Sequence, residues 1–180
     1  MKLLALALLA ALAATPVLAT PAKTKPAAAP HPVAKITDPA PPAKVAEASV
    51  PDPKAFLAAN GKQPGVITTA SGLQYKVSTA GDPKGPAPKP GDIIKVHYEG
   101  KLLNGEVFDS SFARGKPMIA PLGRLVPAWM EALPMMHVGD EWTLYVPPEL
   151  GYGPEGQPPV IPPNAIMVFR IKLLGMLSAA

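Results

Sequence analysis

A tyrosine, a phenylalanine and an aspartate lie around a predicted tight turn, and they are the first candidates for chemistry in this chain. Tyr98 precedes the dipeptide Asn104-Gly105, and Phe108 and Asp109 follow it. Asn-Gly suits the positive φ angles of a short hairpin turn, and strand-like residues flank it, so the segment predicts a β-ribbon. A ribbon would place a phenol, an apolar ring and a carboxyl group close together, as the lining of a binding pocket requires.

Other kinds of chemistry find little support in the sequence. The chain has no cysteine, which excludes thiolate catalysis and a disulfide framework. Its histidines, His31, His97 and His137, are too scattered for a metal site, and no motif indicates a Ser/His/Asp hydrolase. Residues 151–156 match G-x-G-x-x-G, but prolines follow where a dinucleotide site needs a helix. We therefore expect neither a metal nor a cofactor.

Each candidate also has a purely structural interpretation. Asp109 precedes two serines and is suited to cap a turn or a helix, because its oxygens accept free backbone N–H groups. Aromatic residues such as Phe108, Trp129 and Phe169 belong to ordinary cores more often than to pockets. Only their joint occurrence in ordered motifs favours a pocket.

Strands with one buried and one solvent-exposed face, together with one helix, must position these residues. The helix is predicted from Pro127 to about Leu133, where proline suits the first turn and Pro134 interrupts continuation. Apolar and polar residues alternate, as in an antiparallel sheet covered on one side, over 94–99, 141–146 and 169–173, with a weaker strand over 73–77. We expect an α+β fold, in which a twisted antiparallel sheet forms a half-barrel around one short helix.

The start of the chain has the pattern of a secretory signal. A lysine at position 2, an apolar run from Leu3 to Leu12 and small residues up to Ala19 predict a signal peptide over 1–19. A membrane anchor is the alternative, but a span needs about 20 apolar residues. Thr15 and Pro16 interrupt this run. We therefore expect cleavage near Ala19, no stable membrane insertion and a soluble exported product.

Three further segments follow the signal. Residues 20–52 are rich in proline, alanine and lysine and poor in large apolar side chains, which predicts a disordered linker. Residues 53–64 predict a short helical segment that stops at Asn60-Gly61. Residues 65–177 form the predicted globular domain. The net charge is +4, but four lysines, Lys23, Lys25, Lys35 and Lys44, lie in the linker outside the predicted domain, and export makes a nucleic-acid partner less expected still.

The segment from Val96 to Ser111 resembles the signature of FKBP-type prolyl isomerases. The resemblance covers about 73–174, which is nearly all of the predicted domain. Similar blocks recur in the order of the family: RGKP at 114–117, LVPAW at 125–129, MHVGD at 136–140, VPPELGYG at 146–153, VIPPNA at 160–165 and VF at 168–169. The resemblance implies the FKBP-like half-barrel.

It also implies a pocket for a proline ring. Trp129 would form the floor, and Asp109 would lie near the twisting amide and bond Tyr98. The Tyr152 hydroxyl and the Val126 backbone N–H would bind substrate carbonyls. By resemblance, the catalytic group is Tyr98, Asp109, Tyr152 and Val126, and the substrate-binding group is Phe108, Leu125, Trp129, Val160, Ile161 and Phe169, with Leu125 and Val160 at the rim.

The implied activity is peptidyl-prolyl cis-trans isomerisation during folding of exported proteins. Rotation about an X-Pro amide faces a barrier of about 18–20 kcal/mol, part of which reflects solvation of the polar planar form. An apolar pocket removes that solvation and lets the clamped amide twist. The alternative is a chaperone-like or partner-docking module with little turnover. A sugar-binding module would need exposed aromatics with paired polar groups, which the sequence lacks.

Departures from the family pattern concern ligands and assembly. Met118 and Ala120 stand where many members have aromatic residues, so one pocket wall is thinner and affinity for immunosuppressant-class macrolides is in question. Exported relatives resembling macrophage infectivity potentiators often dimerise through a long helical N-terminal region. Residues 56–61 resemble only its last turns, so we expect a monomer. Export and the motif pattern together suggest a Gram-negative periplasm, and partly folded exported polypeptides with X-Pro bonds as partners.

Overall fold

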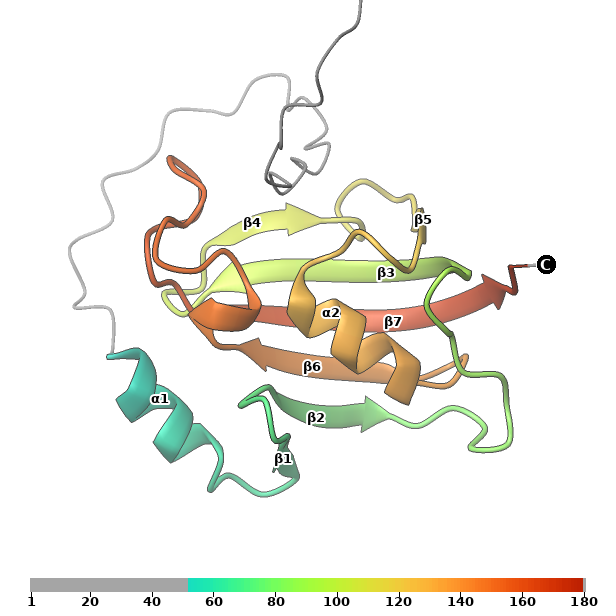
Figure 1. Cartoon of the computed structure of the whole chain (residues 1–180), viewed down its shortest axis with the longest axis horizontal. Helices are drawn as coiled ribbons and strands as arrows, with labels where there is room; N and C mark the ends of the chain where they lie inside the picture. Colours follow the sequence, from blue (N-terminus) through green and yellow to red (C-terminus); the bar gives the residue numbers. More distant parts are fainter. Residues whose placement is uncertain (1–51, 180) are drawn as a thin grey trace, which may run out of the picture. The chain divides into compact units, whose positions relative to one another are not determined.

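The computed structural model describes residues 52–179, which fall within one compact unit. The predicted signal peptide and nearly all of the predicted linker therefore lie outside the described residues. A mainly antiparallel sheet dominates the described part, in the strand order β1-β2-β6-β7-β3-β4, with β5 pairing to β3 (Figure 1). The strands are β1 (Val66–Thr68), β2 (Gln74–Thr79), β3 (Ile93–Leu102), β4 (Val107–Ser110), β5 (Met118–Pro121), β6 (Glu141–Val146) and β7 (Met167–Leu177).

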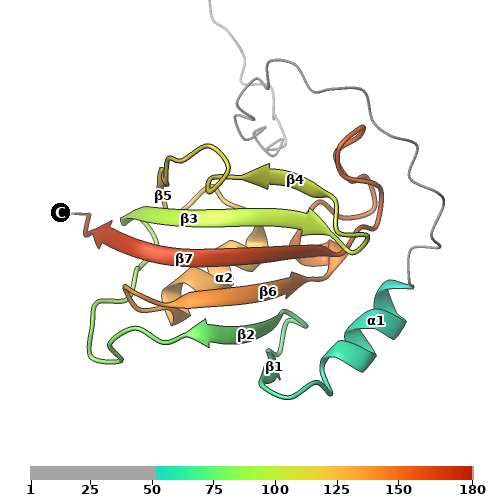
Figure 2. The same ribbon diagram turned by 180° about the vertical axis from the view of Figure 1, so that it is seen from behind.

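Helix α2 (Pro127–Ala132) lies across one face of this sheet, in front of β7 in Figure 1 and behind it in Figure 2. Its buried residues, Ala128, Trp129 and Ala132, pack into the same core as the inward-facing strand residues. The chain continues past Ala132 as the 3₁₀ turn η1 (Leu133–Met135), since Pro134 cannot extend the α-helical hydrogen bonding. The expected α+β fold, with a short helix on an antiparallel sheet, is confirmed.

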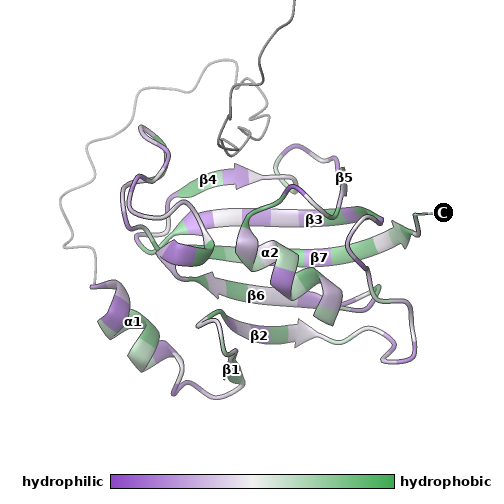
Figure 3. Ribbon diagram, in the orientation of Figure 1, coloured by the Kyte–Doolittle hydropathy of each residue, from purple (hydrophilic) through white to green (hydrophobic). Residues whose placement is uncertain are grey.

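The alternation expected for the strands is present in the buried faces. Along β6, Trp142, Leu144 and Val146 are buried, and the residues between them are partly exposed. Hydropathy accordingly changes from residue to residue along the strands in Figure 3. The weak strand expected over 73–77 is β2, which begins one residue later and runs to Thr79. One face of the sheet is thus committed to the core.

The predicted ribbon is formed by β3 and β4, which pair Glu99 with Ser110 and Gly100 with Asp109. Its turn differs in detail from the expectation for Asn-Gly. Only Gly105 has a positive φ, of 87°. The side chain of Asn104 instead accepts a hydrogen bond of 3.0 Å from the backbone N–H of Glu106. The turn is therefore longer than a two-residue hairpin, and Asn104 acts through its side chain.

Helix α1 (Pro53–Asn60) lies beside the corner of the sheet near β1 and contacts β2 and β6 (Figure 2). The Phe56 ring lies 6.2 Å from the ring of Tyr145, and the Gln74 side chain donates to the carbonyl of Leu57 at 2.8 Å. Asp52 caps the helix by accepting from the N–H of Ala55. A further 3₁₀ turn, η2, covers Pro148–Leu150. Within residues 52–179, no helix is long and apolar enough to cross a membrane.

Candidate active site

Four aromatic rings from four elements form a cage at one end of α2. The Trp129 ring centroid lies 5.2 Å from that of Tyr98 and 5.4 Å from that of Phe169, with interplanar angles of 79° and 84°. Phe108 lies 5.6 Å from Phe169 at 87°. Such edge-to-face packing is the favoured arrangement of aromatic rings, so the cage is a stable apolar surface.

A glycine on β3 makes room for two of these rings. Gly100 pairs with Asp109 on one side and with Phe169 on the other. A Cβ atom at this position would lie 2.6 Å from the tip of the Phe108 ring and 2.7 Å from the ring of Phe169. Since real Cβ atoms do not approach other atoms so closely, any other residue here would displace both rings.

The local structure of α2 sets the position of Trp129. Val126 is the N-cap residue, with the extended backbone angles φ −56° and ψ 146°, and Pro127 begins the helix. The carbonyl of Val126 accepts from the N–H groups of Trp129 and Met130. Among the described residues, the Val126 N–H itself makes no backbone hydrogen bond. The buried Trp129 Nε1 also has no partner there.

A closed polar group lies beside the cage. One Asp109 oxygen accepts a hydrogen bond from the Tyr98 hydroxyl, and the other pairs with the Arg114 guanidinium. A second Arg114 nitrogen lies 3.0 Å from the Tyr98 hydroxyl oxygen, which closes a triangle of three side chains. The side chains of Arg114 and Asp109 are 44% and 39% exposed, so the group faces solvent at the edge of the core.

The alternative capping role of Asp109 does not occur, because Ser110 takes it. The Ser110 hydroxyl accepts from the N–H of Ala113 at 3.2 Å. The Asp109 oxygens are bonded by side chains from β3 and from the loop after β4. Its carboxylate is thus available to the cage.

Burial and charge keep the two phenols of the site protonated. Burial raises the pKa of Tyr98 to about 12, and the hydrogen bond to Asp109 adds to the effect because it favours the phenol form. Burial also raises the pKa of Tyr152, and the charge of Asp109 contributes in the same direction. Both hydroxyls therefore remain hydrogen-bond donors well above neutral pH.

Comparison with known families agrees with this geometry. The family model described as "FKBP-type peptidyl-prolyl cis-trans isomerase" matches residues 85–174, which include every member of the cage and of the polar group. The chain belongs to this family. A second model, for the domain amino terminal to FKBP-type isomerases, matches residues 1–77.

Individual relatives are bacterial proteins of the same family. The chain is 49% identical over 123 residues to the peptidyl-prolyl cis-trans isomerase Mip of Coxiella burnetii, covering 68% of this chain and 53% of that protein. It is 46% identical over 122 residues to the FKBP-type 22 kDa isomerase of Escherichia coli, covering 68% and 58%. The chain thus spans little more than half the length of these relatives.

Solved FKBP structures match the described fold. The crystal structure of FkpA from Escherichia coli superimposes with a TM-score of 0.66 at 41% identity, covering 71% of this chain and 59% of that one. An isomerase structure from Pseudomonas syringae gives a TM-score of 0.66 at 31% identity, covering 79% and 100%.

The FKBP structure brings most of the predicted pocket residues into one cluster. Leu125, Val126 and Tyr152 are partly buried and pack against the core that contains Trp129 and Phe169. Ile161 is buried and is held by backbone hydrogen bonds with Gln157. Val160 next to it is 45% exposed, as suits a rim residue. The roles of these residues toward a substrate stay predictions.

Sequence reasoning missed Arg114 as a member of this site. Arg114 begins the family-like block RGKP at 114–117, but the sequence alone assigned no role to it. The available signal was its charge, since an arginine five residues after Asp109 can reach back to a carboxylate at the end of a strand. The structure shows that Arg114 contacts both Asp109 and Tyr98.

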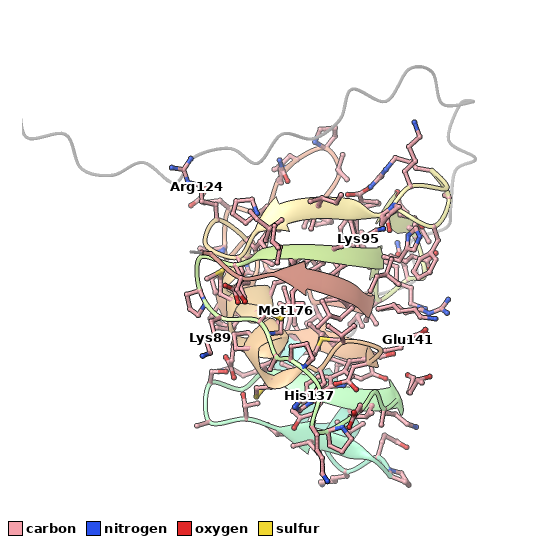
Figure 4. The ribbon with its side chains drawn as sticks, turned by 90° about the vertical axis from the view of Figure 1, so that its right-hand side faces the viewer. Lys89, Lys95, Arg124, His137, Glu141 and Met176 are labelled. Carbon is pink, nitrogen blue, oxygen red and sulfur yellow. The ribbon has the colours of Figure 1, made fainter. Side chains whose placement is uncertain are left out.

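A second hollow lies at the far end of α2, on the β2 side of the sheet. It has a volume of about 360 Å³ and includes the stacked rings of Tyr75 and Trp142, 4.4 Å apart at 8°. Asp140 and His137 border it, and His137 is labelled in Figure 4. It is separate from the aromatic cage, since the two share no residue. The other residues lining it are Ile67, Val77, Ala80, Gly81, Pro83 and Met135.

Proposed function

We propose that this chain is a peptidyl-prolyl cis-trans isomerase that acts on X-Pro bonds of unfolded or partly folded polypeptides. The observation that carries the proposal is the closed group of Tyr98, Asp109 and Arg114 at the edge of a cage floored by Trp129. Membership of the FKBP family supports the same activity.

The cage suits a reaction in which no bond is broken. The planar amide is polar because of resonance, and water stabilises it over the twisted form. A proline ring packed on Trp129 between Phe108 and Phe169 would lose that water. Each 1.36 kcal/mol of preferential binding to the twisted form then gives about a tenfold acceleration.

Polar groups around the cage would hold the substrate while it twists. We assign the free N–H of Val126 and the phenol of Tyr152 to the substrate carbonyls, since both are donors. Asp109 would lie beside the rotating amide, and Tyr98 and Arg114 would keep its carboxylate in place. A fixed negative group costs no reorganisation during the reaction.

The proposal is tested by isomerisation of proline tetrapeptides with the full chain. The test variant combines Trp129→Ala and Asp109→Ala. The control combines Tyr75→Ala and Val77→Ala, which removes comparable side chains from the second hollow. Acceleration by the wild type and the control, lost in the test variant, is expected. A folded wild type without acceleration contradicts the proposal, and if it still suppresses aggregation of an unfolded protein, the chain is a docking module instead.

We also propose that the protein is exported to a periplasm and acts there as a monomer. The charged start and apolar run of residues 1–19 support export. So does the similarity to "Outer membrane protein MIP" of Legionella longbeachae, which is 41% identical over 126 residues. The prolines of residues 20–52, which are unfavourable inside a long helix, support the monomer. Sedimentation showing a concentration-independent dimer would contradict the monomer.

Immunosuppressant-class macrolides are further proposed ligands of the same cage. Met118 packs against the core where an aromatic wall was expected from the family pattern. Its flexible side chain makes a softer wall, so we expect weaker macrolide binding than a Met118→Phe variant would show. Titration of the tryptophan fluorescence with a macrolide, in a Trp142→Phe background that leaves Trp129 as the single tryptophan, measures this difference.

A further inference from the structure

Strand β3 has a gap in its pairing at the residue that carries the active-site phenol. On one edge, β3 pairs with β5 as far as Val96, and with β4 only from Glu99 onward. His97 and Tyr98 between them have no strand partner on that edge, although β7 pairs with both on the other. A buried backbone N–H left in such a gap needs another acceptor.

The hydroxyl of Ser111 fills this gap. The Tyr98 N–H donates to Ser111 Oγ at 2.7 Å, and the Ser111 N–H donates to the Tyr98 carbonyl at 2.9 Å. Ser111 Oγ also lies 3.1 Å from that carbonyl. Ser111 is fully buried, so water cannot replace it. One side chain therefore substitutes for a missing strand partner at Tyr98.

His97 holds the Ser111 hydroxyl from the outer side of the sheet. Its Nδ1 lies 3.0 Å from Ser111 Oγ. The imidazole stacks on the Phe112 ring at 4.7 Å and 18°. The guanidinium of Arg170 lies 4.8 Å from the centre of the Phe112 ring and pairs with Glu141 at 2.6 Å. Figure 4 shows Glu141 on the side of the sheet away from α2. The serine is thus fixed by a stack of side chains behind the pocket.

We propose that Ser111 and His97 are positioning residues of the isomerase site. They fix the backbone of Tyr98, and through it the phenol that bonds Asp109 and Arg114. Ser111 bonds the backbone of Tyr98, and His97 bonds Ser111. Their effect on turnover depends on the proposed function. A displacement of about 1 Å in a reacting group can lower the rate as much as about a hundredfold.

The test compares variants of the full chain in two measurements. Ser111→Ala removes the acceptor, His97→Phe keeps the stacked ring but removes its nitrogen, and His97→Asn keeps a polar atom near the Nδ1 position. Gln74→Ala is the matched control, because Gln74 is also buried and bonds backbone, but at α1. The first measurement is kcat/KM on a proline tetrapeptide. The second is the pKa of Tyr98, followed by NMR of protein labelled with ¹³Cζ-tyrosine, which requires no turnover.

We expect Ser111→Ala to lower kcat/KM about tenfold. Its Tyr98 pKa should fall from about 12 toward 10.0, because a displaced phenol loses part of its burial, the main cause of the raised pKa, and also its hydrogen bond to Asp109. His97→Phe should lower kcat/KM about threefold, and His97→Asn should restore it to within about twofold of wild type. Gln74→Ala should lower the melting temperature and leave both measurements unchanged.

Two results would overturn the positioning role. One is a folded Ser111→Ala or His97→Phe protein with wild-type kcat/KM and Tyr98 pKa. The other is a Gln74→Ala protein that changes both as much, which would indicate general loosening. If the Ser111→Ala protein does not fold, the kcat/KM and Tyr98 pKa of the His97→Phe protein decide the positioning role. If the wild type has no isomerase activity, the proposed function fails, and the Tyr98 pKa alone still decides the positioning role.

Discussion

The two ends of helix α2 carry similar sets of residues with different surroundings. At one end, Trp129 packs with Tyr98 beside Asp109. At the other, Trp142 stacks on Tyr75 above the second hollow, which Asp140 borders. Both tryptophans are buried, and both indole Nε1 atoms lack a partner among the described residues. An apolar lining with an aspartate is therefore not enough to identify the active site.

The hydrogen-bond partners of the two aspartates separate the regions. Asp140 accepts from the backbone N–H groups of Gly81 and His137, and its side chain is 7% exposed. Within residues 52–179, Asp109 accepts only from side chains, and it is 39% exposed. The rings differ as well, because parallel stacking covers a face of Trp142, whereas the rings around Trp129 stand nearly perpendicular to it. Asp140 therefore stabilises the fold, whereas Asp109 lies partly exposed at the edge of the cage, where Tyr98 and Arg114 hold it.

The largest effect should come from Asp109→Ala. Loss of a fixed carboxylate at the cage is expected to lower kcat/KM about 100-fold. The free energy of unfolding should change by less than about 1 kcal/mol, because the pair with Arg114 is well exposed. Tetrapeptide isomerisation and urea unfolding measure the two effects. A wild-type kcat/KM would remove Asp109 from the mechanism.

Asp140→Ala should give the opposite result. Two backbone N–H groups lose their acceptor in a buried place, so the free energy of unfolding is expected to fall by about 2–4 kcal/mol. The kcat/KM of the folded protein should stay at the wild-type value. If Asp140→Ala lowered kcat/KM as strongly as Asp109→Ala does, the distinction between the two regions would be wrong.

Gly100→Ala tests whether the cage depends on its ring positions. The added Cβ would overlap Phe108 and Phe169, so we expect a loss of about 1–3 kcal/mol in stability. The same displacement should lower kcat/KM about tenfold. Gly123→Ala is a suitable control, because a Cβ there meets no atom within 4 Å and the residue has no positive φ. Equal kcat/KM values for Gly100→Ala and Gly123→Ala would show that the activity does not depend on the positions of the Phe108 and Phe169 rings.

The smallest effect concerns pH. The Tyr98 pKa is about 12 in the folded chain and near 10.0 when unperturbed. Between these values the unfolded chain binds fewer protons than the folded one, so the free energy of unfolding should fall as pH rises from 10.0 to about 12. Tyr98→Phe should flatten that decline in a series of urea melts. An unchanged decline would assign it to other groups.

The sequence predicted the sheet, the short helix and the ribbon, because each depends on local periodicity and turn chemistry. Alternation in β6 and the proline at the start of α2 are signals of this kind. The position of the turn at Gly105 was predicted correctly, but its conformation was not. The side chain of Asn104 takes part in the turn by accepting a hydrogen bond. Local rules do not show whether such a side chain or the backbone closes a turn.

The site was predictable only in part, since its remaining members depend on tertiary contacts. The resemblance to FKBP-type isomerases predicted the cage residues, and the structure places them around Trp129. Nothing in the sequence distinguishes Asp109 from Asp140 or Trp129 from Trp142 without it. The contacts of Arg114 and the role of Ser111 depend on where β4 ends and β5 begins along β3. That boundary is a property of the folded sheet.

The pairing of Arg114 with Asp109 has a consequence for how substrates reach the pocket. The two opposite charges lie in contact at its edge, so they cancel beyond a few ångströms. Substrate encounter at this edge is then not steered by long-range attraction, and its rate should depend little on ionic strength. Cancelled charge at this edge therefore predicts that acidic and basic peptides reach the pocket at similar rates.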